Sequence, residues 1–440
     1  MSALLDQAKK IVALARQKGA AEARASAYSS REVEITWRDG RVEKVSEATT
    51  RGASVSLYVD GRYSSVSTSD LRPEALERFL EESIAMARTL AKDPFRALPD
   101  PKLYAGRASV DLQLYDPKYE SVTADVRRRI AREMEEAARG VKGNDAIVSV
   151  ETGVSDTKSM SATATSNGFE GEREETQFWQ SASVTCKDKD GRRPEEYDMA
   201  GGHFFAELPS PADVGRRAAE RTLGTLGAAK MKSGVVPLVI ENRAGGRMLR
   251  SLLGALTGRA LQQKQSFLDG KLGKEVASKL LTVTDEPHLA KGLASRLYDG
   301  DGFATKKRAV FEKGVLRTYF IDDYYARKLK VDPTTGGTTN LVIVGGKKTM
   351  DELVADIKEG ILVTGFLGGN SNSTTGDYSA GIQGYRIASG KRAEPIAEMN
   401  ISGNLEAFWK KLTAVGSDPW VYSSARTPTL VFDGIQVAGL

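Results

Sequence analysis

The side chains that could carry out catalysis or bind a metal are few in this chain of 440 residues, and they lie far apart. There are two histidines, His203 and His288, and a single cysteine, Cys186. A catalytic zinc ion usually takes three protein ligands, drawn mainly from histidine and cysteine. A Ser-His-Asp or Cys-His arrangement likewise needs a histidine beside its nucleophile. Either kind of site therefore requires the fold to bring distant residues together.

Each of these three residues also has a simpler structural interpretation. His288 follows Asp285 and Glu286 in a stretch typical of a loop, where we expect it to face solvent. His203 lies between a glycine pair and two phenylalanines, which favours a partly buried packing position. Cys186 ends an alternating strand, and we expect it to fill space as a small apolar side chain.

Two other patterns resemble fragments of ligand sites but are incomplete. Gly245 and Gly246 in ENRAGGRML could cradle an anion at the start of a helix. The spacing of a dinucleotide motif and the Lys-Ser/Thr of a phosphate loop are both missing, so close backbone packing explains this pair better. Asp299 and Asp301 in YDGDGF lack the later ligands of a calcium loop, which favours a turn before a strand.

The segment from Gly368 to Leu405 has an unusual composition. It begins GGNSNSTTGD, where Gly, Asn, Ser and Thr favour tight turns, and continues into strands that carry Tyr378, Tyr385 and Ile387. A polar loop presented by rigid strands is a common construction for a binding site. Composition alone supports a simple hairpin loop equally well.

The overall composition argues against several classes of protein. Lys and Arg total 63 and Asp and Glu total 58, so the net charge of +5 reflects two large, interspersed sets. Direct binding to nucleic acid or to an anionic membrane is therefore not expected. The N-terminus lacks the apolar core of a signal peptide, and no later stretch is long and apolar enough to cross a membrane. Together with the single cysteine, these features predict a cytoplasmic protein without intrachain disulfides.

The pattern of apolar residues predicts an α+β fold with two domains, because 440 residues exceed one ordinary core. Asp39-Gly40 and Asp60-Gly61 each separate alternating strands and predict two hairpins. Helical periodicity predicts helices over 3–18, 73–90, 121–139, 211–227 and 244–261. We expect an N-terminal α+β domain of hairpins and helices over 1–230. We expect a β-rich, barrel- or sandwich-like domain over 231–440.

Several longer motifs resemble one known family. They are QSFLDGKLG (265–273), DGDGFATKKRAVFEKGVLRTYFIDDYYARKL (299–329), GGNSNSTTGD, EMNISGNL and VGSD (415–418). On these residues the chain is similar to the TldD/PmbA family, whose members are often described as modulators of DNA gyrase. The similarity extends over most of the chain, although the first half agrees in layout more than in motif.

The resemblance implies a particular activity and a particular partner. In this family, a TldD-type subunit carries the motif H-E-x-x-x-H on a helix, and a downstream cysteine completes a zinc site. It pairs with a PmbA-type subunit, also called TldE, to form a metallopeptidase. The pair encloses a chamber that admits unfolded peptides. Proteolysis, a zinc cofactor and a second subunit are therefore what the resemblance leads us to expect.

This sequence resembles the PmbA type, because the zinc motif is missing. After the strand PLVI it reads ENRAGGRML, which places Glu241 and Asn242 where the motif has its first His and its Glu. Gly246 stands where the motif has its second His. Zinc hydrolysis needs two imidazoles one helical turn apart and a carboxylate that activates water. The segment VGSDPWVYSSARTPTLVFDG also lacks the cysteine, so the resemblance implies no catalytic residue and no metal ligand in this chain, with zinc on the partner.

The function that the resemblance implies is a non-catalytic subunit of a heteromeric zinc metallopeptidase. In this hypothesis the 368–405 segment lines the chamber and holds an extended peptide, for example as an added strand. The candidate residues for binding substrate or partner are Asn370, Asn372, Thr375, Asp377, Tyr378, Glu398 and Asn404.

Two alternative functions are compatible with the sequence. The first is a self-contained peptidase, as a homodimer, that uses His288, His203 or carboxylates as unconventional ligands. The second is a protein that binds gyrase or another client without proteolysis. The hypothesis of a two-subunit peptidase also allows this chain to form a homodimer when the partner is absent.

Overall fold

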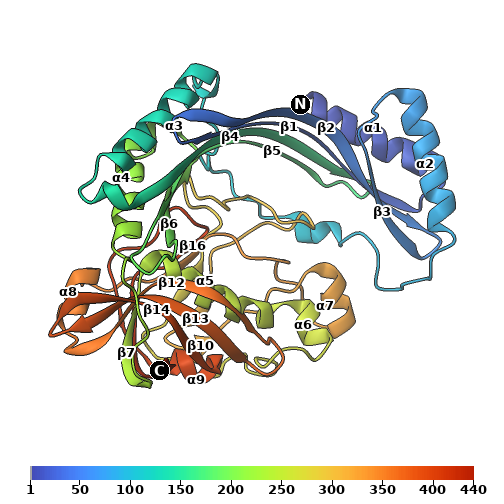
Figure 1. The fold of residues 1–440 in the computed structure, drawn as a ribbon. Helices are drawn as coiled ribbons and strands as arrows, with labels where there is room; N and C mark the ends of the chain where they lie inside the picture. The colour runs from blue at the N-terminus through green and yellow to red at the C-terminus, as the bar shows by residue number, and fades with distance from the viewer. Residues whose placement is uncertain (1) are drawn as a thin grey trace.

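Six antiparallel strands form a long sheet, the N-terminal sheet, in the computed structural model, which describes residues 2–440. Their spatial order is β3-β2-β1-β4-β5-β6. The strands are β1 Glu22–Arg38, β2 Arg41–Val59, β3 Arg62–Thr68, β4 Ile147–Thr165, β5 Glu170–Cys186 and β6 Glu195–Gly202. Figure 1 shows this sheet as an arch over the C-terminal half of the chain.

Tight turns explain why consecutive strands are neighbours. Asp39 and Gly40 both have positive φ, of 47° and 84°, and Asp60 and Gly61 have 50° and 74°. Two positive φ angles are what a type I′ turn requires, and this turn matches the twist of the flanking strands. The two predicted hairpins are therefore confirmed, and they join β1 to β2 and β2 to β3.

Two pairs of helices cover one face of the N-terminal sheet. α1 (Ala3–Gln17) and α2 (Pro73–Ala87) share a hydrophobic core with Ala162 and Ala164 of β4. α3 (Ala124–Arg139) and α4 (Pro211–Leu223) share another core with Val150 and Val154 of the same strand. These four β4 residues are all even-numbered, and alternate residues of a strand point to the same face. The other face of the sheet therefore points toward the C-terminal half.

Five strands of the C-terminal half close into a barrel. The sheet order is β14-β13-β12-β7-β17-β15, and an additional pairing of β14 with β17 joins the two sides. β7 and β12 run parallel. The prediction of a β-rich, barrel- or sandwich-like second half is confirmed, and the barrel is the form that the chain adopts. The strands are β7 Gly234–Ile240, β12 Glu359–Ser371, β13 Asp377–Ala388, β14 Lys391–Asn404, β15 Leu412–Val415 and β17 Leu430–Ala438.

A smaller five-stranded sheet, in the order β10-β9-β8-β11-β16, shares one hydrophobic core with the barrel. The α+β fold class is thus confirmed. None of the helices in residues 2–440 combines the length and the apolar character that crossing a membrane requires. The remaining elements are β8 Val283–Asp285, β9 Arg308–Glu312, β10 Val315–Leu316, β11 Leu341–Ile343, β16 Ala425–Arg426, α5 Asn242–Leu253, α6 Gly258–Gln262, α7 Asp323–Leu329, α8 Met350–Ala355 and α9 Leu405–Lys410.

The single helix predicted over 244–261 is instead two helices, α5 and α6. A short 3-10 turn follows α5 from Gly254 to Leu256, and Thr257 then begins α6 by accepting a hydrogen bond at its hydroxyl from the Ala260 N–H. A side chain at Gly258 would lie 2.8 Å from Tyr325 Cβ. The break therefore lets α6 approach α7 closely.

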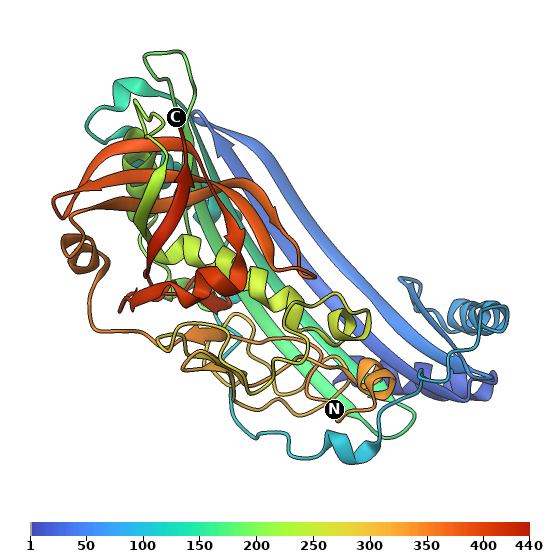
Figure 2. The ribbon, with the colours of Figure 1, turned by 90° about the horizontal axis from the view of Figure 1, so that it is seen from below.

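The connector between α2 and α3 joins the N-terminal sheet to the C-terminal half. Its Leu114 carbonyl accepts a hydrogen bond from the Thr176 N–H of β5 (2.9 Å), and its Leu112 carbonyl accepts one from the Lys291 N–H (2.8 Å). Figure 2 shows the strands of the N-terminal sheet running along the length of the C-terminal half. The last strand of this sheet ends at Gly202, and the barrel begins at Gly234.

Candidate functional site

The turn between β12 and β13 brings four of the seven candidate residues together. Asn372 accepts a hydrogen bond at Oδ1 from the Thr374 N–H (2.9 Å). Thr375 donates its hydroxyl to Asp377 Oδ2 (2.7 Å) and accepts a hydrogen bond from the Asp377 N–H (3.2 Å). Asn404 donates from Nδ2 to the Thr375 carbonyl (2.9 Å). These side chains therefore fix the shape of an exposed turn.

The other three candidate residues are placed differently. Asn370 is exposed in β12, close to the turn in sequence. Tyr378 is buried with its ring centroid 5.4 Å from that of Phe408, and burial raises the pKa of its phenol. Glu398 lies farther along β14, where it forms an ion pair with Lys230 (3.6 Å). The structure thus places six of the seven residues at or beside one turn, with only Glu398 apart from it, and their role in binding stays a prediction.

α5 contacts the start of this segment directly. Arg247 of α5 donates from Nη2 to the carbonyl oxygens of Gly368 and Gly369. Its guanidinium also lies over the Phe366 ring, 5.5 Å from the centroid. Gly369 has a φ of 97°, and a side chain there would begin 2.3 Å from the Ser379 carbonyl oxygen, so only glycine fits. α5 and the beginning of the 368–405 segment are therefore held together.

A bidentate ion pair holds the start of α5. The carboxylate of Glu241, the residue before this helix, accepts hydrogen bonds from Arg221 Nη1 (2.7 Å) and Nη2 (2.8 Å). The Arg221 side chain, which comes from α4, is 20% exposed, and that of Glu241 is 12% exposed. Burial by itself lowers the pKa of Arg221, but the hydrogen bonds to Glu241 and the negative charges of Glu241, Glu196 and Asp198 together outweigh it and raise that pKa. Glu196 of β6 lies 4.0 Å from the same guanidinium, and burial raises the pKa of its carboxyl.

A second set of charged contacts lies around the first turn of α5. Asp198 of β6 is buried and accepts hydrogen bonds from Arg217 Nε (2.7 Å) and Arg243 Nη1 (3.2 Å). The Arg243 guanidinium lies over the rings of Tyr197 and Trp420, 4.5 and 5.6 Å from their centroids. These contacts join α4 and β6 of the N-terminal half to α5. Ion pairs between arginines and carboxylates thus surround the N-terminus of α5.

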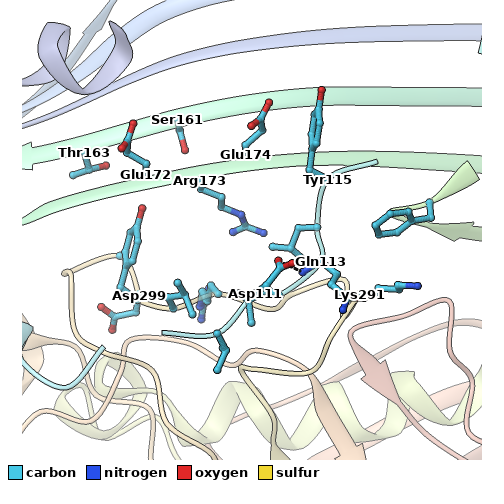
Figure 3. Close-up of a pocket in the computed structure, with 18 of the residues that line it drawn as sticks. Asp111, Gln113, Tyr115, Ser161, Thr163, Glu172, Arg173, Glu174, Lys291 and Asp299 are labelled. Atoms are coloured by element: carbon cyan, nitrogen blue, oxygen red, sulfur yellow. Dashed lines mark hydrogen bonds between the residues drawn. The ribbon is translucent and has the colours of Figure 1, made fainter. Parts of the chain in front are cut away.

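A cavity of about 910 Å³ lies between the N-terminal sheet and the C-terminal half (Figure 3). Its walls come from β4 and β5, from the connector at 110–117 and from residues 291–300. Arg173 points into the cavity from β5, whereas Glu172 and Glu174 point away from it. No local pattern in the sequence predicts this cavity, because the three walls are far apart in the chain.

Comparison with known families covers most of the chain. Three family models match it: PmbA/TldA metallopeptidase domain 1 over 23–87, the central domain over 117–226 and the C-terminal domain over 233–439. The chain belongs to the PmbA/TldD metallopeptidase family. The resemblance noted in the sequence is therefore confirmed.

Individual PmbA/TldD proteins match the chain over almost its full length. Metalloprotease PmbA of Escherichia coli O157:H7 is 28% identical over 410 residues, which cover 92% of this chain and 90% of that protein. The PmbA homolog of Haemophilus influenzae is 29% identical over 439 residues, with 96% and 94% covered. The crystal structure of a proposed modulator of DNA gyrase from Bacteroides thetaiotaomicron has a TM-score of 0.96 at 42% identity, with 99% and 98% covered. TldE from Thermococcus kodakarensis has a TM-score of 0.87 at 20% identity, with 98% and 100% covered, which shows a shared fold.

The residues that the family resemblance places opposite the zinc motif do not suit a metal in this chain. Glu241 is already held in its ion pair. Asn242 donates from Nδ2 to the Asp418 carbonyl (2.7 Å), and a side chain at Gly246 would begin 3.1 Å from Arg250 Nη1. The part of the chain that the structure describes contains no group of three or more His, Cys, Asp or Glu side chains placed to hold a metal ion. This set of donors does not fit zinc, which favours histidine and cysteine.

The two histidines and the cysteine of this PmbA/TldD protein have structural positions. His203 is fully rather than partly buried. Its ring nitrogens lie 2.7 and 3.3 Å from the carbonyl oxygens of Thr176 and Gly292, and these contacts connect the two halves of the chain. His288 is half-buried rather than solvent-facing, with Nε2 3.3 Å from a threonine hydroxyl. Cys186 is buried in a hydrophobic core, and burial raises its pKa to about 11. This environment confirms the prediction of an apolar filler.

Proposed function

We propose that this chain is the PmbA/TldE-type, non-catalytic subunit of a zinc metallopeptidase complex that cleaves unfolded peptides. The observation that carries the proposal is the ion pair of Glu241 with Arg221, at the position where a TldD-type subunit has its first zinc histidine. A carboxylate in this arrangement would have to give up two charge-assisted hydrogen bonds to bind a metal. Gly246, at the second position, offers no donor. In this proposal the zinc and the bond cleavage belong to a TldD-type partner.

In the proposed complex, the turn between β12 and β13 holds the extended substrate or meets the partner. Asn370 and Asn372 present exposed amides on a rigid strand and turn. An amide both donates and accepts hydrogen bonds, so it can bind a peptide backbone whatever the side chains are. Asp377 and Asn404 maintain the turn and are positioning residues. Arg247 supports this role because it ties the segment to α5, the helix that corresponds to the partner's zinc helix.

Reconstitution with the partner tests the proposal. The chain is co-expressed with the H-E-x-x-x-H subunit encoded in the same genome, and hydrolysis of an unfolded, internally quenched peptide is measured. We expect the pair to be active, this chain alone to be inactive, and the partner alone to be at least about tenfold slower than the pair. A partner that is equally active with and without this chain would contradict the proposal.

One comparison favours a second function. The Bacteroides thetaiotaomicron relative is described as a proposed modulator of DNA gyrase. On that description we propose, as the second function, that this chain binds gyrase without proteolysis. A pull-down from cell extract with the tagged chain separates the two functions. Recovery of an H-E-x-x-x-H subunit supports the peptidase complex. Recovery of gyrase without such a subunit supports the second function.

A further inference from the structure

Arg173 extends from β5 into the cavity between the N-terminal sheet and the C-terminal half (Figure 3). It shares a face of the sheet with Gly171, where a side chain would meet the ring of Tyr298. Its Nη2 donates to Glu175 Oε2 (2.6 Å). Within the described residues, Nε is buried without a hydrogen-bond partner and Nη1 has none either, so Nη1 is the atom that remains available to a ligand.

Arg296 lies on another wall of the same cavity, in the 291–300 segment. Its Nη2 donates to two backbone carbonyls (3.2 and 2.8 Å), but no carboxylate among the described residues forms an ion pair with it. Burial lowers the pKa of its guanidinium. Asp299 and Asp285 oppose that shift, whereas the positive charge of Arg173 adds to it. Two guanidinium groups therefore line one cavity, that of Arg173 paired with Glu175 and that of Arg296 without an ion pair among the described residues.

Among the described acidic residues near the cavity, Glu175 forms an ion pair with Arg173, and none forms one with Arg296. Asp299 is buried and accepts three hydrogen bonds from backbone N–H groups. Glu172 and Glu174 point away from the cavity (Figure 3). Asp111 is exposed and accepts a hydrogen bond from a nearby backbone N–H (2.8 Å). Arg296 is thus a partly buried charge without an ion pair among the described residues, which costs free energy, and an anionic ligand would offset that cost.

The free edge of β5 favours a peptide over a small anion as the ligand. β6 pairs with β5 only over 178–185, and the connector then contributes the single hydrogen bond from the Thr176 N–H to the Leu114 carbonyl. Over 170–175 the described residues provide no backbone partner on this edge. Its N–H and C=O groups border the cavity and are open to a peptide backbone.

We propose that this cavity binds a carboxylate group of a peptide between Arg173 and Arg296. The inference rests on the proposed function, which brings unfolded peptides to this chain, and it names the chemical group that the site selects. Nη1 of each guanidinium can donate a charge-assisted hydrogen bond to one oxygen of the same carboxylate. The volume of about 910 Å³ leaves room for further atoms of the peptide beside the charged group. The carboxylate is either the C-terminus or an Asp or Glu side chain.

Peptide titrations with the full-length chain test this site. Four fluorescein-labelled peptides share one uncharged sequence, and binding is followed by fluorescence anisotropy. They are a free C-terminal acid, a C-terminal amide, an amide with one Glu and an amide with Gln in its place. We expect the acid peptide, the Glu peptide or both to bind about tenfold more tightly than the uncharged peptides. Comparison of the acid peptide with the Glu peptide distinguishes a terminal from a side-chain carboxylate.

Single-residue variants test whether the preference for peptides with a carboxylate comes from this cavity. Arg173→Gln should abolish the preference, so that the acid and Glu peptides bind no more tightly than the uncharged peptides. Arg173→Lys keeps the charge but not the planar fork and should retain part of it. Arg78→Gln is the matched control, because it removes the same charge from a side chain of α2 that is 77% exposed. Arg296→Gln tests the other wall independently, and thermal melts confirm that each variant is folded.

Three results would overturn the carboxylate site: equal binding of all four peptides, binding of none of them, or a preference that survives in both Arg173→Gln and Arg296→Gln. The proposed function is judged by the separate reconstitution assay. A reconstituted pair that is active but shows no preference for carboxylates would remove this inference alone and leave the proposed function in place.

Discussion

Arg221 of α4 holds the carboxylate of Glu241 through two hydrogen bonds, of 2.7 and 2.8 Å, immediately before the first residue of α5. The pair joins the N-terminal half of the molecule to the C-terminal half. It occupies the position at which the family resemblance places the first zinc histidine of a TldD-type subunit. Charged contacts thus stabilise this PmbA-type chain at the place where its proposed partner holds a metal.

Glu241→Gln should lower the free energy of unfolding by about 3 kcal/mol. The substitution leaves the largely buried guanidinium of Arg221 with Glu196 as its nearest carboxylate, at 4.0 Å. Chemical denaturation followed by tryptophan fluorescence measures the change.

Glu359→Gln is the matched control for this prediction. It breaks an ion pair with Arg386 in which the Glu side chain is 54% exposed. Exposed pairs contribute little, so this variant should unfold at the same denaturant concentration as the wild type. If Glu241→Gln costs no more than the control, the ion pair does not have the structural role assigned to it.

The purified chain should contain far less than one zinc ion, and a chelator should leave its melting temperature unchanged. The reason is that the described residues offer no cluster of His, Cys, Asp or Glu suited to a metal. Elemental analysis and thermal melts with and without the chelator provide the measurement. Stoichiometric zinc that disappears in a His288→Ala variant would instead support a self-contained peptidase.

Gly215→Ala should destabilise the chain by about 3 kcal/mol, because α3 and α4 touch at this residue. The added Cβ would lie 1.9 Å from the Met134 carbonyl oxygen, so the helices would have to separate. Gly254→Ala is the control: Gly254 has helical angles (φ −56°, ψ −36°), and the nearest atom to its added Cβ is 4.0 Å away. That variant should be as stable as the wild type or slightly more stable. Equal melting temperatures for the two variants would show that the helix contact can relax.

Asp323 should make the stability of the chain fall as the pH rises from about 4 to about 6. Burial raises the pKa of this carboxyl from 3.8 to about 6, although Arg327 opposes the shift. The folded state therefore binds the proton more tightly than the unfolded state, and the stability that this adds is lost as the pH rises through the folded pKa.

Asp323→Asn removes this titration and serves as the comparison. The free energy of unfolding of the wild type minus that of the variant should fall by on the order of 1 kcal/mol between pH 4 and pH 7. Urea denaturation at several pH values measures it. A difference that increases with pH would mean that the ion pair with Arg327 outweighs burial.

Short-range features of this fold are predictable from the sequence, whereas its assembly is not. The turns at Asp39-Gly40 and Asp60-Gly61 follow from adjacent residues, since their φ angles are a local property. The barrel closes where Ile401 of β14 pairs with Val437 of β17. That contact depends on the positions of all the intervening strands, so apolar periodicity indicates strands without selecting a barrel over a sandwich.

In the candidate site, too, features set by neighbouring residues are predictable from the sequence, whereas contacts between distant residues are not. Gly246 stands out as a missing ligand because a zinc motif places its residues within two turns of one helix. Arg221, the partner of Glu241, lies on a different helix, and spacing along the sequence does not connect them. Arg173 lies in the charged stretch EGEREET, which reads as an ordinary exposed strand. Only the packing of the two halves shows that it faces a cavity together with Arg296.

The measurement that tests the central claim most directly is the rate at which reconstituted pairs with single substitutions hydrolyse an unfolded peptide. Replacing either histidine of the partner's H-E-x-x-x-H motif by alanine should abolish activity. His288→Ala in this chain should leave activity unchanged, because the one hydrogen bond of the ring within the described residues is a long one to Thr305 (3.3 Å). A pair that tolerates loss of the partner's histidines but loses activity with His288→Ala would contradict the assignment of catalysis to the partner.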